Sequence, residues 1–539
     1  MNQLVITNHA DGGSSPPMSR RRPLAFGITL AIAVLALGVG GLEAAFRIID
    51  RYALTSVQLV SLPAPVVKLD ETAVAPYVDR LPIAPGVDRA WFALNPAQET
   101  RPFDLDLEKR YRSHRGQELP AVYEWNEEYV RSAICDEPSG YETIFKPLGE
   151  VFTFVPRDGR RFPQFRFLRS AHLPSGLKTN NFGWRGPDIA LEKPARTIRI
   201  AFVGGSVTIG LHRTPFSYPD HVRKWLEVWG ASRHPETKFE VVNAAREGVA
   251  STGIAAIARD EVAPIDPDLV VYYEGGNSFW PLDFIEWPKG ANAIPSTRPK
   301  NTPPKQAPWV LEGRSALVVR VKGLVQRSYL RSREPEKPVL PVKWPASLTE
   351  HDPQLDHAQL PAPVRTTMQD LDTIRLALQP TAARLGASSF VWCVYDGMRL
   401  DPKTNVGVYE FLNTTFWPFS YFHLRRMVDF QNRVLAKYAK ERDADFIDAA
   451  RDFPVDPRLF FDAVHMLPPG SKLLGWTTFQ QLVPLIDRRI AAGEWPRPAR
   501  LHLTTHPAFD QPMRHLVQAS AIRASCVPRA TPLPPAHDE

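Results

Sequence analysis

Five residues that lie far apart in the sequence have the chemical groups that acyl transfer requires: Ser206, Gly248, Asn277, Asp462 and His465. A serine hydroxyl attacks an acyl carbon once an imidazole takes its proton, and the imidazole needs a carboxylate that fixes its tautomer. The oxyanion formed in that step needs hydrogen-bond donors. The N–H groups of Ser206 and Gly248 and the side-chain amide of Asn277 are candidate donors.

Each of these residues also has a structural interpretation. Ser206 fits a helix cap, while Gly248 and Asn277 fit turns at strand ends. Asp462 and His465 fit a polar loop before the last helix. For any one residue the structural interpretation is the simpler one, and it is their coincidence at strand ends that favours catalysis.

The elements that carry these residues form an alternating pattern of strands and helices. Continuous apolar strands separated by helices predict a parallel sheet covered on both faces, which is a doubly wound α/β fold. In such a sheet, ligands bind outside the carboxyl ends of the strands. Strands are expected at 197–205, 239–245, 267–276, 388–397 and 444–450, with amphipathic helices at 217–230 and 425–443.

Four sequence blocks occur in a fixed order: Gly-Gly-Ser-x-Thr, Asn-x-x-x-x-Gly, Gly-x-Asn and Asp-x-x-His. This order resembles the SGNH hydrolase superfamily, also called GDSL esterases and lipases. By that resemblance Ser206 is the nucleophile, His465 the base and Asp462 its partner. Ser206, Gly248 and Asn277 form the oxyanion hole. The resemblance implies a flavodoxin-like three-layer α/β/α sandwich, and the chemistry requires no metal and no organic cofactor.

The resemblance begins upstream of the first strand and departs from the family in two places. The stretch TNNFGWRGPD (179–188) resembles the family's lead-in to that strand. We interpret three of its residues as structural and not as substrate contacts: Asn180, Gly183 and Arg185. Gly205 stands where the family name expects aspartate, and Ser278 follows the asparagine where aspartate is common. These departures bear on the surroundings of the site and on the substrate.

Other layouts with a similar loop fit less well. An α/β-hydrolase elbow needs Gly-x-Ser-x-Gly, but Val207 and Thr208 follow the serine. GGSVTIG also lacks the Gly-Lys-Ser/Thr of a phosphate-binding loop and the glycine spacing of a dinucleotide site. These three classes are therefore disfavoured.

Charge and cysteine usage exclude further classes. The net charge is +7, but the basic residues are scattered and do not form the aromatic-rich basic patch typical of nucleic-acid binding. The three cysteines, at 135, 393 and 526, have no metal-ligand spacing. Cys393 fits a small buried core residue, and a Cys135–Cys526 bridge is left open.

An uncharged apolar stretch at residues 23–42 is long enough to cross a bilayer as a helix. Arg20, Arg21 and Arg22 precede it, so the positive-inside rule predicts a cytoplasmic amino terminus and an extracytoplasmic remainder. A signal peptide is the rival interpretation, although the apolar region is long and LEAAF is a poor cleavage site. The net positive charge suits an anionic membrane surface.

The chain is expected to divide into a tail (1–22), the transmembrane helix, a membrane-proximal region (43–165), an SGNH-like domain (166–500) and a loosely ordered end (501–539). The proline-rich connection 281–365 is too long for an ordinary crossover and is predicted to be an insertion. Within it, residues 315–333 are basic and partly amphipathic. They fit either a helix on the membrane surface or a solvated helix docked on the domain.

These features together predict a membrane-anchored serine esterase or O-acyltransferase that acts on acyl esters. Attack of water on the acyl-enzyme gives an esterase, and attack of a sugar hydroxyl gives a transferase. The location beside the cell envelope suggests an O-acetylated glycan as substrate. The alternative is a non-catalytic envelope scaffold that keeps the fold and binds a partner.

Overall fold

The structure, a computed structural model, describes two compact units. The first contains residues 1–68 and 300–338, and the second contains 69–299 and 339–539. The described residues are 21–50, 52–59, 71–97, 123–126, 150–155, 165–167, 178–210, 216–278, 282–286, 313–322, 324, 340–393, 419, 421–454, 456, 459–460, 463–503 and 513–525.

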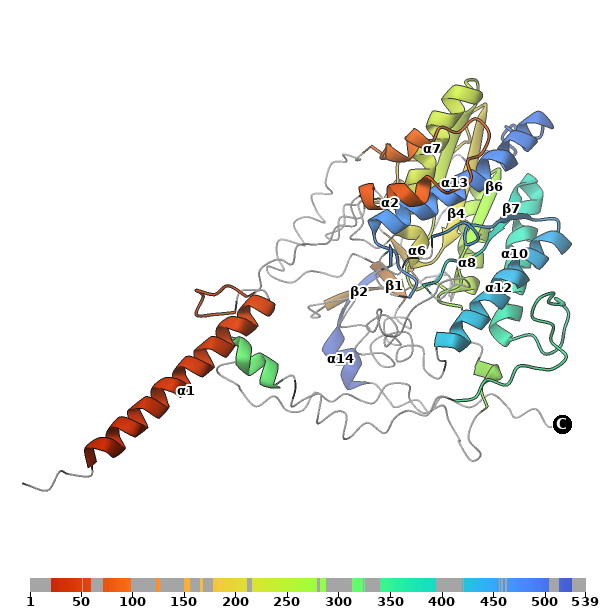
Figure 1. The fold of residues 1–539 in the computed structure, drawn as a ribbon. Helices are drawn as coiled ribbons and strands as arrows, with labels where there is room; N and C mark the ends of the chain where they lie inside the picture. The colour runs from red at the N-terminus through yellow and green to blue at the C-terminus, as the bar shows by residue number, and fades with distance from the viewer. Residues whose placement is uncertain are drawn as a thin grey trace, which may run out of the picture. The chain divides into compact units, whose positions relative to one another are not determined.

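The first unit is built on one long helix, α1 (Arg21–Ile49), seen in Figure 1. Its stretch Phe26–Ile49 is long and apolar enough to cross a membrane. A signal sequence can have the same length and composition. The helix continues past the expected end at residue 42, where Glu43 and Arg47 form an ion pair one helical turn apart. The orientation of this helix in a membrane stays a prediction.

Part of the insertion docks against the carboxyl end of α1 within this unit. Residues 316–322 are helical. The carboxylate of Glu43 accepts hydrogen bonds from the Ser315 hydroxyl at 2.8 Å and from the N–H groups of residues 316 and 317 at 2.9 Å. Arg320 pairs with Asp50 at 2.6 Å. The described part of the basic segment 315–333 is therefore a helix that packs on α1, while docking on the domain and contact with a membrane stay predictions.

The second unit contains a five-stranded parallel sheet with strand order β5-β4-β6-β7-β8. In chain order this is second, first, third, fourth and fifth, the flavodoxin-like arrangement. The predicted doubly wound α/β fold is thus confirmed by the strand order. The strands are β4 (Thr197–Gly204), β5 (Lys238–Asn243), β6 (Leu269–Tyr273), β7 (Arg384–Ser388) and β8 (Asp445–Ile447).

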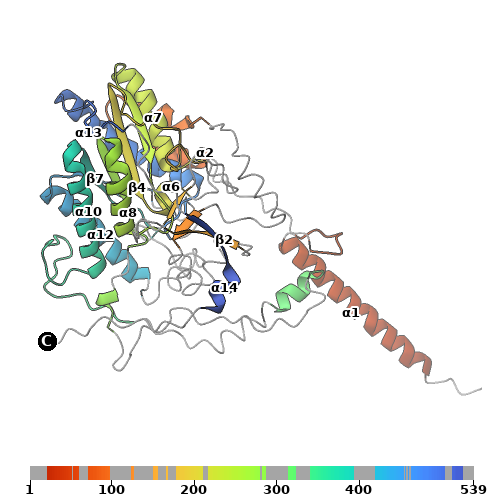
Figure 2. The ribbon, with the colours of Figure 1, turned by 180° about the vertical axis from the view of Figure 1, so that it is seen from behind.

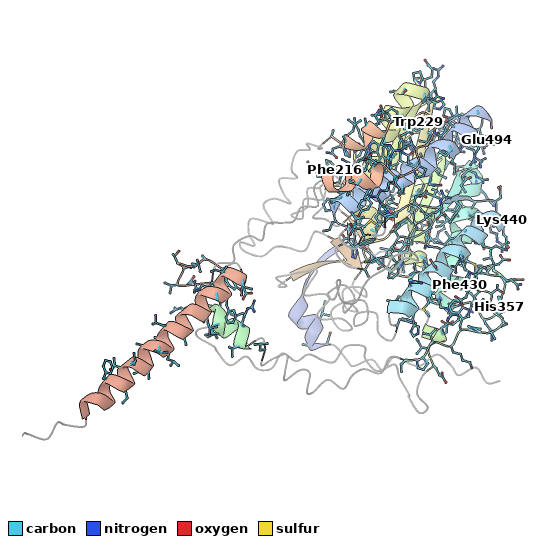
Figure 3. All side chains as sticks on the ribbon, in the orientation of Figure 1. Phe216, Trp229, His357, Phe430, Lys440 and Glu494 are labelled. Atoms are coloured by element: carbon cyan, nitrogen blue, oxygen red, sulfur yellow. The ribbon has the colours of Figure 1, made fainter. Side chains whose placement is uncertain are left out.

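Helices cover both faces of this sheet, as Figures 1 and 2 show. On one face α7 packs against α13; on the other, α10 packs against α8 and α12. Buried aromatic residues such as Trp229 of α7 anchor these helices (Figure 3). The helices are α7 (Tyr218–Arg233), α8 (Ser251–Ile257), α10 (Ala362–Leu378), α12 (Tyr421–Glu441) and α13 (Pro468–Ala491).

The fourth strand differs from its prediction. It spans Arg384–Ser388, so the expected strand 388–397 is wrong at residues 389–393, while residues 394–397 lie outside the described residues. The neighbouring strand β6 ends at Tyr273. The residues that follow β7 form hydrogen bonds with side chains and not with a strand. The N–H of Phe390 bonds to a side-chain oxygen of α12, and that of Val391 to the Tyr273 hydroxyl. Residues 389–393 are therefore buried in a loop and not in a strand.

The regions flanking the main domain contribute elements that the sequence did not predict. In the membrane-proximal region α2 (Glu71–Val78) and η1 (Arg89–Ala93) pack beside the domain, where the Trp225 indole of α7 donates to the Trp91 carbonyl at 2.7 Å. A second sheet has the order β3-β1-β2-β9, so the end expected to be loosely ordered contributes a strand and a short helix. These elements are β1 (Tyr123–Asn126), β2 (Glu150–Val155), β3 (Phe165–Phe167), β9 (Met513–Gln518) and α14 (Ala519–Ala524).

Candidate active site

Ser206 begins a one-turn helix, α6 (Ser206–Ile209), just after β4, the first strand of the sheet in chain order. Its hydroxyl oxygen lies 2.7 Å from Nε2 of His465, a residue 259 positions later in the chain. This is the distance at which an imidazole can take a hydroxyl proton. The fold therefore brings together the predicted nucleophile and base.

The loop that carries His465 is fixed at both ends by backbone hydrogen bonds. The Cys393 N–H donates to the carbonyl of Ala463 at 2.7 Å, and the Leu467 N–H donates to Leu459 at 2.8 Å. Cys393 itself is buried, as predicted. Asp462 lies outside the described residues, as do the other two cysteines. The role of Asp462 as partner of the histidine stays a prediction.

The two glycines before Ser206 are explained by close contacts between strand ends. A Cβ atom on Gly204 would overlap the carbonyl oxygen of Tyr273, at the end of the adjacent strand β6, and the side chain of Thr208. A Cβ atom on Gly205 would lie 2.7 Å from Nδ2 of Asn277 and would overlap the Glu274 carboxylate. Glycine is needed here because the ends of β4 and β6 approach so closely.

The two predicted oxyanion donors follow β5 and β6 and lie next to each other. Gly248 has a φ of 64°, in the left-handed region that favours glycine. Asn277 is exposed, and its amide nitrogen donates to the carbonyl of Val249 at 3.2 Å. The same nitrogen, which carries two hydrogens, also lies 3.5 Å from Oε2 of Glu274. Asn277 and the loop after β5 thus meet beside Gly205.

Glu274, which the sequence analysis did not single out, is the buried carboxylate of this site. It ends the buried β6 segment in YYEGGNS and is 2% exposed. Its carboxylate accepts the Asn277 N–H at 2.5 Å. Burial raises the pKa of Glu274 to about 7, although hydrogen bonds from the N–H groups of residues 275–278 act to lower it. The sequence signal for this buried carboxylate is a charged residue directly after an apolar strand.

The lead-in stretch 179–188 contacts the end of α6, the helix that begins with Ser206. The guanidinium of Arg185 donates to the carbonyls of Ile209 and Gly210 at 2.9 and 3.3 Å. Its Nε lies 3.3 Å from a carboxylate oxygen of Asp220. Arg185 is buried, so its position fits the predicted structural role.

The remaining lead-in residues shape the turn that presents Arg185. The side-chain oxygen of Asn180 accepts the N–H groups of Phe182 and Trp184 at 2.9 Å. Gly183 has a φ of 81°, which favours glycine. These contacts also fit the predicted structural role.

A cavity with an empty volume of about 270 Å³ opens beside the Ser206–His465 pair. Val207, Met466 and Leu474 contribute apolar walls, and Ser471 contributes a hydroxyl. Among the described residues, no group of three or more His, Cys, Asp or Glu side chains is arranged to hold a metal ion. The described groups have the geometry for nucleophilic attack by a serine.

No protein-family model and no curated protein matches the chain. Similar solved structures include an acetyl xylan esterase of Geobacillus stearothermophilus (16% identity, TM-score 0.29, 54% of this chain and 97% of the other). A GDSL-like lipase of Bacteroides thetaiotaomicron has 12% identity and a TM-score of 0.28, over 56% of this chain and 92% of its own. An α/β hydrolase from the Lake Arreo metagenome in Spain has 13% identity and a TM-score of 0.27, over 56% and 97%.

The class of the fold follows from the strand order of this chain and from the helices on both faces of its sheet. The chain therefore has a flavodoxin-like three-layer α/β/α fold, the fold that its resemblance to the SGNH hydrolases implies.

Proposed function

We propose that the chain is a serine esterase or O-acyltransferase that forms an acyl-enzyme on Ser206. The observation that carries this proposal is the 2.7 Å contact between the Ser206 hydroxyl and Nε2 of His465 at the carboxyl edge of the sheet. A helix-capping serine would not need a histidine from a distant loop. The glycines and the asparagine beside this pair are further support.

The proposed reaction has two symmetrical halves. His465 takes the proton of Ser206 while Oγ bonds to the acyl carbon, and the resulting oxyanion is held by the N–H groups of Ser206 and Gly248 and the Asn277 amide. The bond to the alcohol oxygen then breaks, and His465 gives that oxygen the proton. Water or a sugar hydroxyl attacks the serine ester in the same way, which releases the acid or the new ester and restores the serine.

The amino-terminal helix is the basis for the proposed location of the catalytic domain. With Arg20, Arg21 and Arg22 on the cytoplasmic side, an uncleaved α1 would place the catalytic domain outside the cytoplasmic membrane. O-acylated envelope glycans would then be within reach of an anchored enzyme. A reporter enzyme that is active only outside the cytoplasm, fused after residue 539, tests this orientation. We expect that fusion to be active.

The test of the function is covalent labelling of the full-length protein in nanodiscs with a fluorophosphonate. This probe reacts with a serine that a base has activated. We expect labelling of the parent protein and of the Ser347→Ala control, which removes an exposed serine hydroxyl far from His465 in sequence. Ser206→Ala and His465→Ala should abolish it. A folded parent that takes no label would favour the non-catalytic scaffold.

A further inference from the structure

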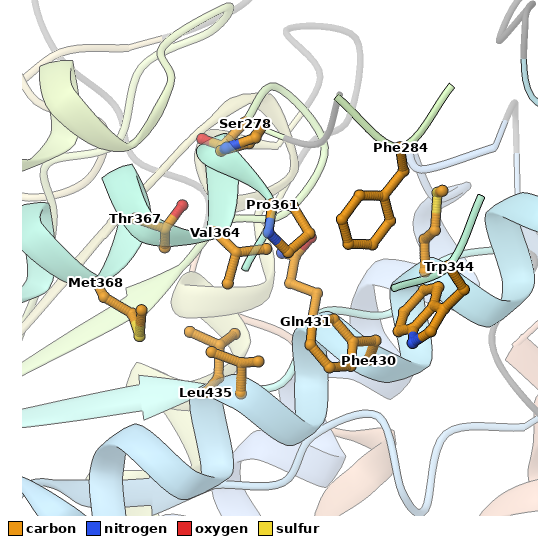
Figure 4. A pocket seen from close by; sticks show the side chains of 13 residues that line it. Ser278, Phe284, Trp344, Pro361, Val364, Thr367, Met368, Phe430, Gln431 and Leu435 are labelled. Atoms are coloured by element: carbon orange, nitrogen blue, oxygen red, sulfur yellow. The ribbon is translucent and has the colours of Figure 1, made fainter. Parts of the chain in front are cut away.

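An apolar pocket with an empty volume of about 460 Å³ lies between α10 and α12 (Figure 4). Val364 and Met368 of α10 face Phe430 and Leu435 of α12 across it. Its lining is mainly apolar with a few polar groups, as in small-molecule sites. This composition suits an apolar ligand.

The two ends of the insertion build one wall of this pocket. Residues 282–286 and 340–344 are joined by a bridge between Ile285 and Val342 and by a hydrogen bond from the Lys343 N–H to the Phe284 carbonyl at 2.8 Å. The ring of Phe284 lies 5.1 Å from that of Trp344, and the Trp344 ring lies 5.0 Å from that of Phe430. These edge-on ring contacts fix the wall.

A second contact holds Trp344 in place from outside. The guanidinium of Arg426 lies 4.3 Å from the centre of the Trp344 ring, and it pairs with Glu350. The Trp344 indole N–H donates to the Leu348 carbonyl at 3.1 Å. Trp344 is thus held by a cation over its ring, by two ring contacts and by a hydrogen bond at its nitrogen, and it forms a built wall of the pocket.

The pocket adjoins the loop that carries the oxyanion donor. Ser278, the residue after Asn277, lines the pocket. Gln431 also lines it and packs so closely on Gly275 that a Cβ there would lie 2.7 Å from its amide nitrogen. The same loop also contacts Gly205, because a Cβ there would lie 2.7 Å from Nδ2 of Asn277. The loop 275–278 thus borders both the pocket and the residue that precedes the reacting serine.

We propose that this pocket holds the acyl chain of the substrate and that the protein prefers acyl groups longer than acetyl. This inference rests on the proposed acyl-enzyme at Ser206. The acyl oxygen would point to Asn277 and the chain would pass the loop into the pocket. The alcohol would lie in the separate cavity lined by His465, which returns its proton. Each methylene buried should raise kcat/KM about fourfold until the pocket is full.

The test is a series of p-nitrophenyl esters from acetate to octanoate, hydrolysed by the full-length protein in nanodiscs. The parent should prefer octanoate to acetate at least tenfold. Val364→Trp, which fills the pocket, should lower kcat/KM for octanoate at least tenfold and leave acetate within twofold. Leu376→Trp is the matched control, because Leu376 lies on the same helix but is exposed and outside the pocket.

A parent that prefers acetate, or a Val364→Trp protein that loses all esters equally, would overturn the pocket assignment. Trp344→Ala, which removes the wall, gives a second variant with the same expected selective loss should Val364→Trp not fold. Labelling by ethyl and octyl fluorophosphonates separates the two proposals. Equal labelling by both probes would reject the acyl pocket alone, while labelling by neither would reject the activated serine as well.

Discussion

The carboxyl end of β4 and the pocket between α10 and α12 both border the loop 275–278, yet they are built in different ways. Around Gly205 and Ser206 the neighbours are polar atoms at hydrogen-bond distance, and even one added carbon would overlap them. The pocket is walled by larger apolar side chains from several segments, with an empty volume of about 460 Å³.

The difference reflects what each region has to do. Acyl transfer requires groups held to within about half an ångström, so the backbone crowds the serine and glycine becomes obligatory. Holding an apolar chain requires volume and shape, which many apolar side chains can provide. Substitutions should therefore have large effects at the first region and graded effects at the second.

The largest effect we expect in this comparison is that of Asn277→Ala. If the Asn277 amide donates to the oxyanion, its loss should lower kcat by about a hundredfold to a thousandfold with little change in KM. Steady-state kinetics on one ester measures both constants. A rise in KM with unchanged kcat would show that Asn277 binds the ground state instead.

Gly205→Ala should have the next largest effect. Its Cβ would displace the amide of Asn277 and the buried carboxylate of Glu274, and a misplacement of about 1 Å can cost on the order of a hundredfold in rate. Gly276→Ala is the matched control on the adjacent loop, because the nearest atoms to its Cβ would lie at 3.6 Å. Similar kinetics for the two variants would mean that crowding at Gly205 is irrelevant to catalysis.

Glu274→Gln should change the pH dependence of stability. Because the pKa of Glu274 is raised from 4.5 to about 7 in the folded protein, ionisation opposes folding. Its stabilising contribution is full below pH 4.5 and is lost as pH rises through 7. The parent should thus lose on the order of 3 kcal/mol relative to Glu274→Gln over that range, measured by urea unfolding. If the two proteins had the same dependence of unfolding free energy on pH, the Glu274 carboxyl would be exposed to solvent and not buried.

The same difference explains what could be predicted from the sequence. The serine, the histidine and the oxyanion residues sit in short motifs at strand ends, and four of five strands are continuous apolar runs that were placed correctly to within a few residues. The residues of the second region are ordinary apolar positions of helices and of an insertion. Nothing in Phe284 or Trp344 indicates that they meet, since their contact depends on the tertiary fold.

Two errors have physical causes of the same kind. The expected strand 388–397 is more apolar than Arg384–Ser388, but the burial of residues 389–393 comes from a core loop and not from the sheet. The strand β9 pairs with β2, more than three hundred residues earlier in the sequence, and local patterns carry little information about such pairing.

Met368→Leu should have the smallest effect and tests whether the pocket tolerates a change of shape. The swap nearly conserves volume, so it should cost less than about 1.5 kcal/mol of stability. We expect kcat/KM for octanoate to stay within about threefold, whereas the isosteric Asn277→Asp at the loop should lose most activity because a carboxylate repels an oxyanion. A large effect of Met368→Leu would mean that the pocket depends on exact side-chain shape, as the serine site does. A region that only provides volume should accept a leucine as well as a methionine.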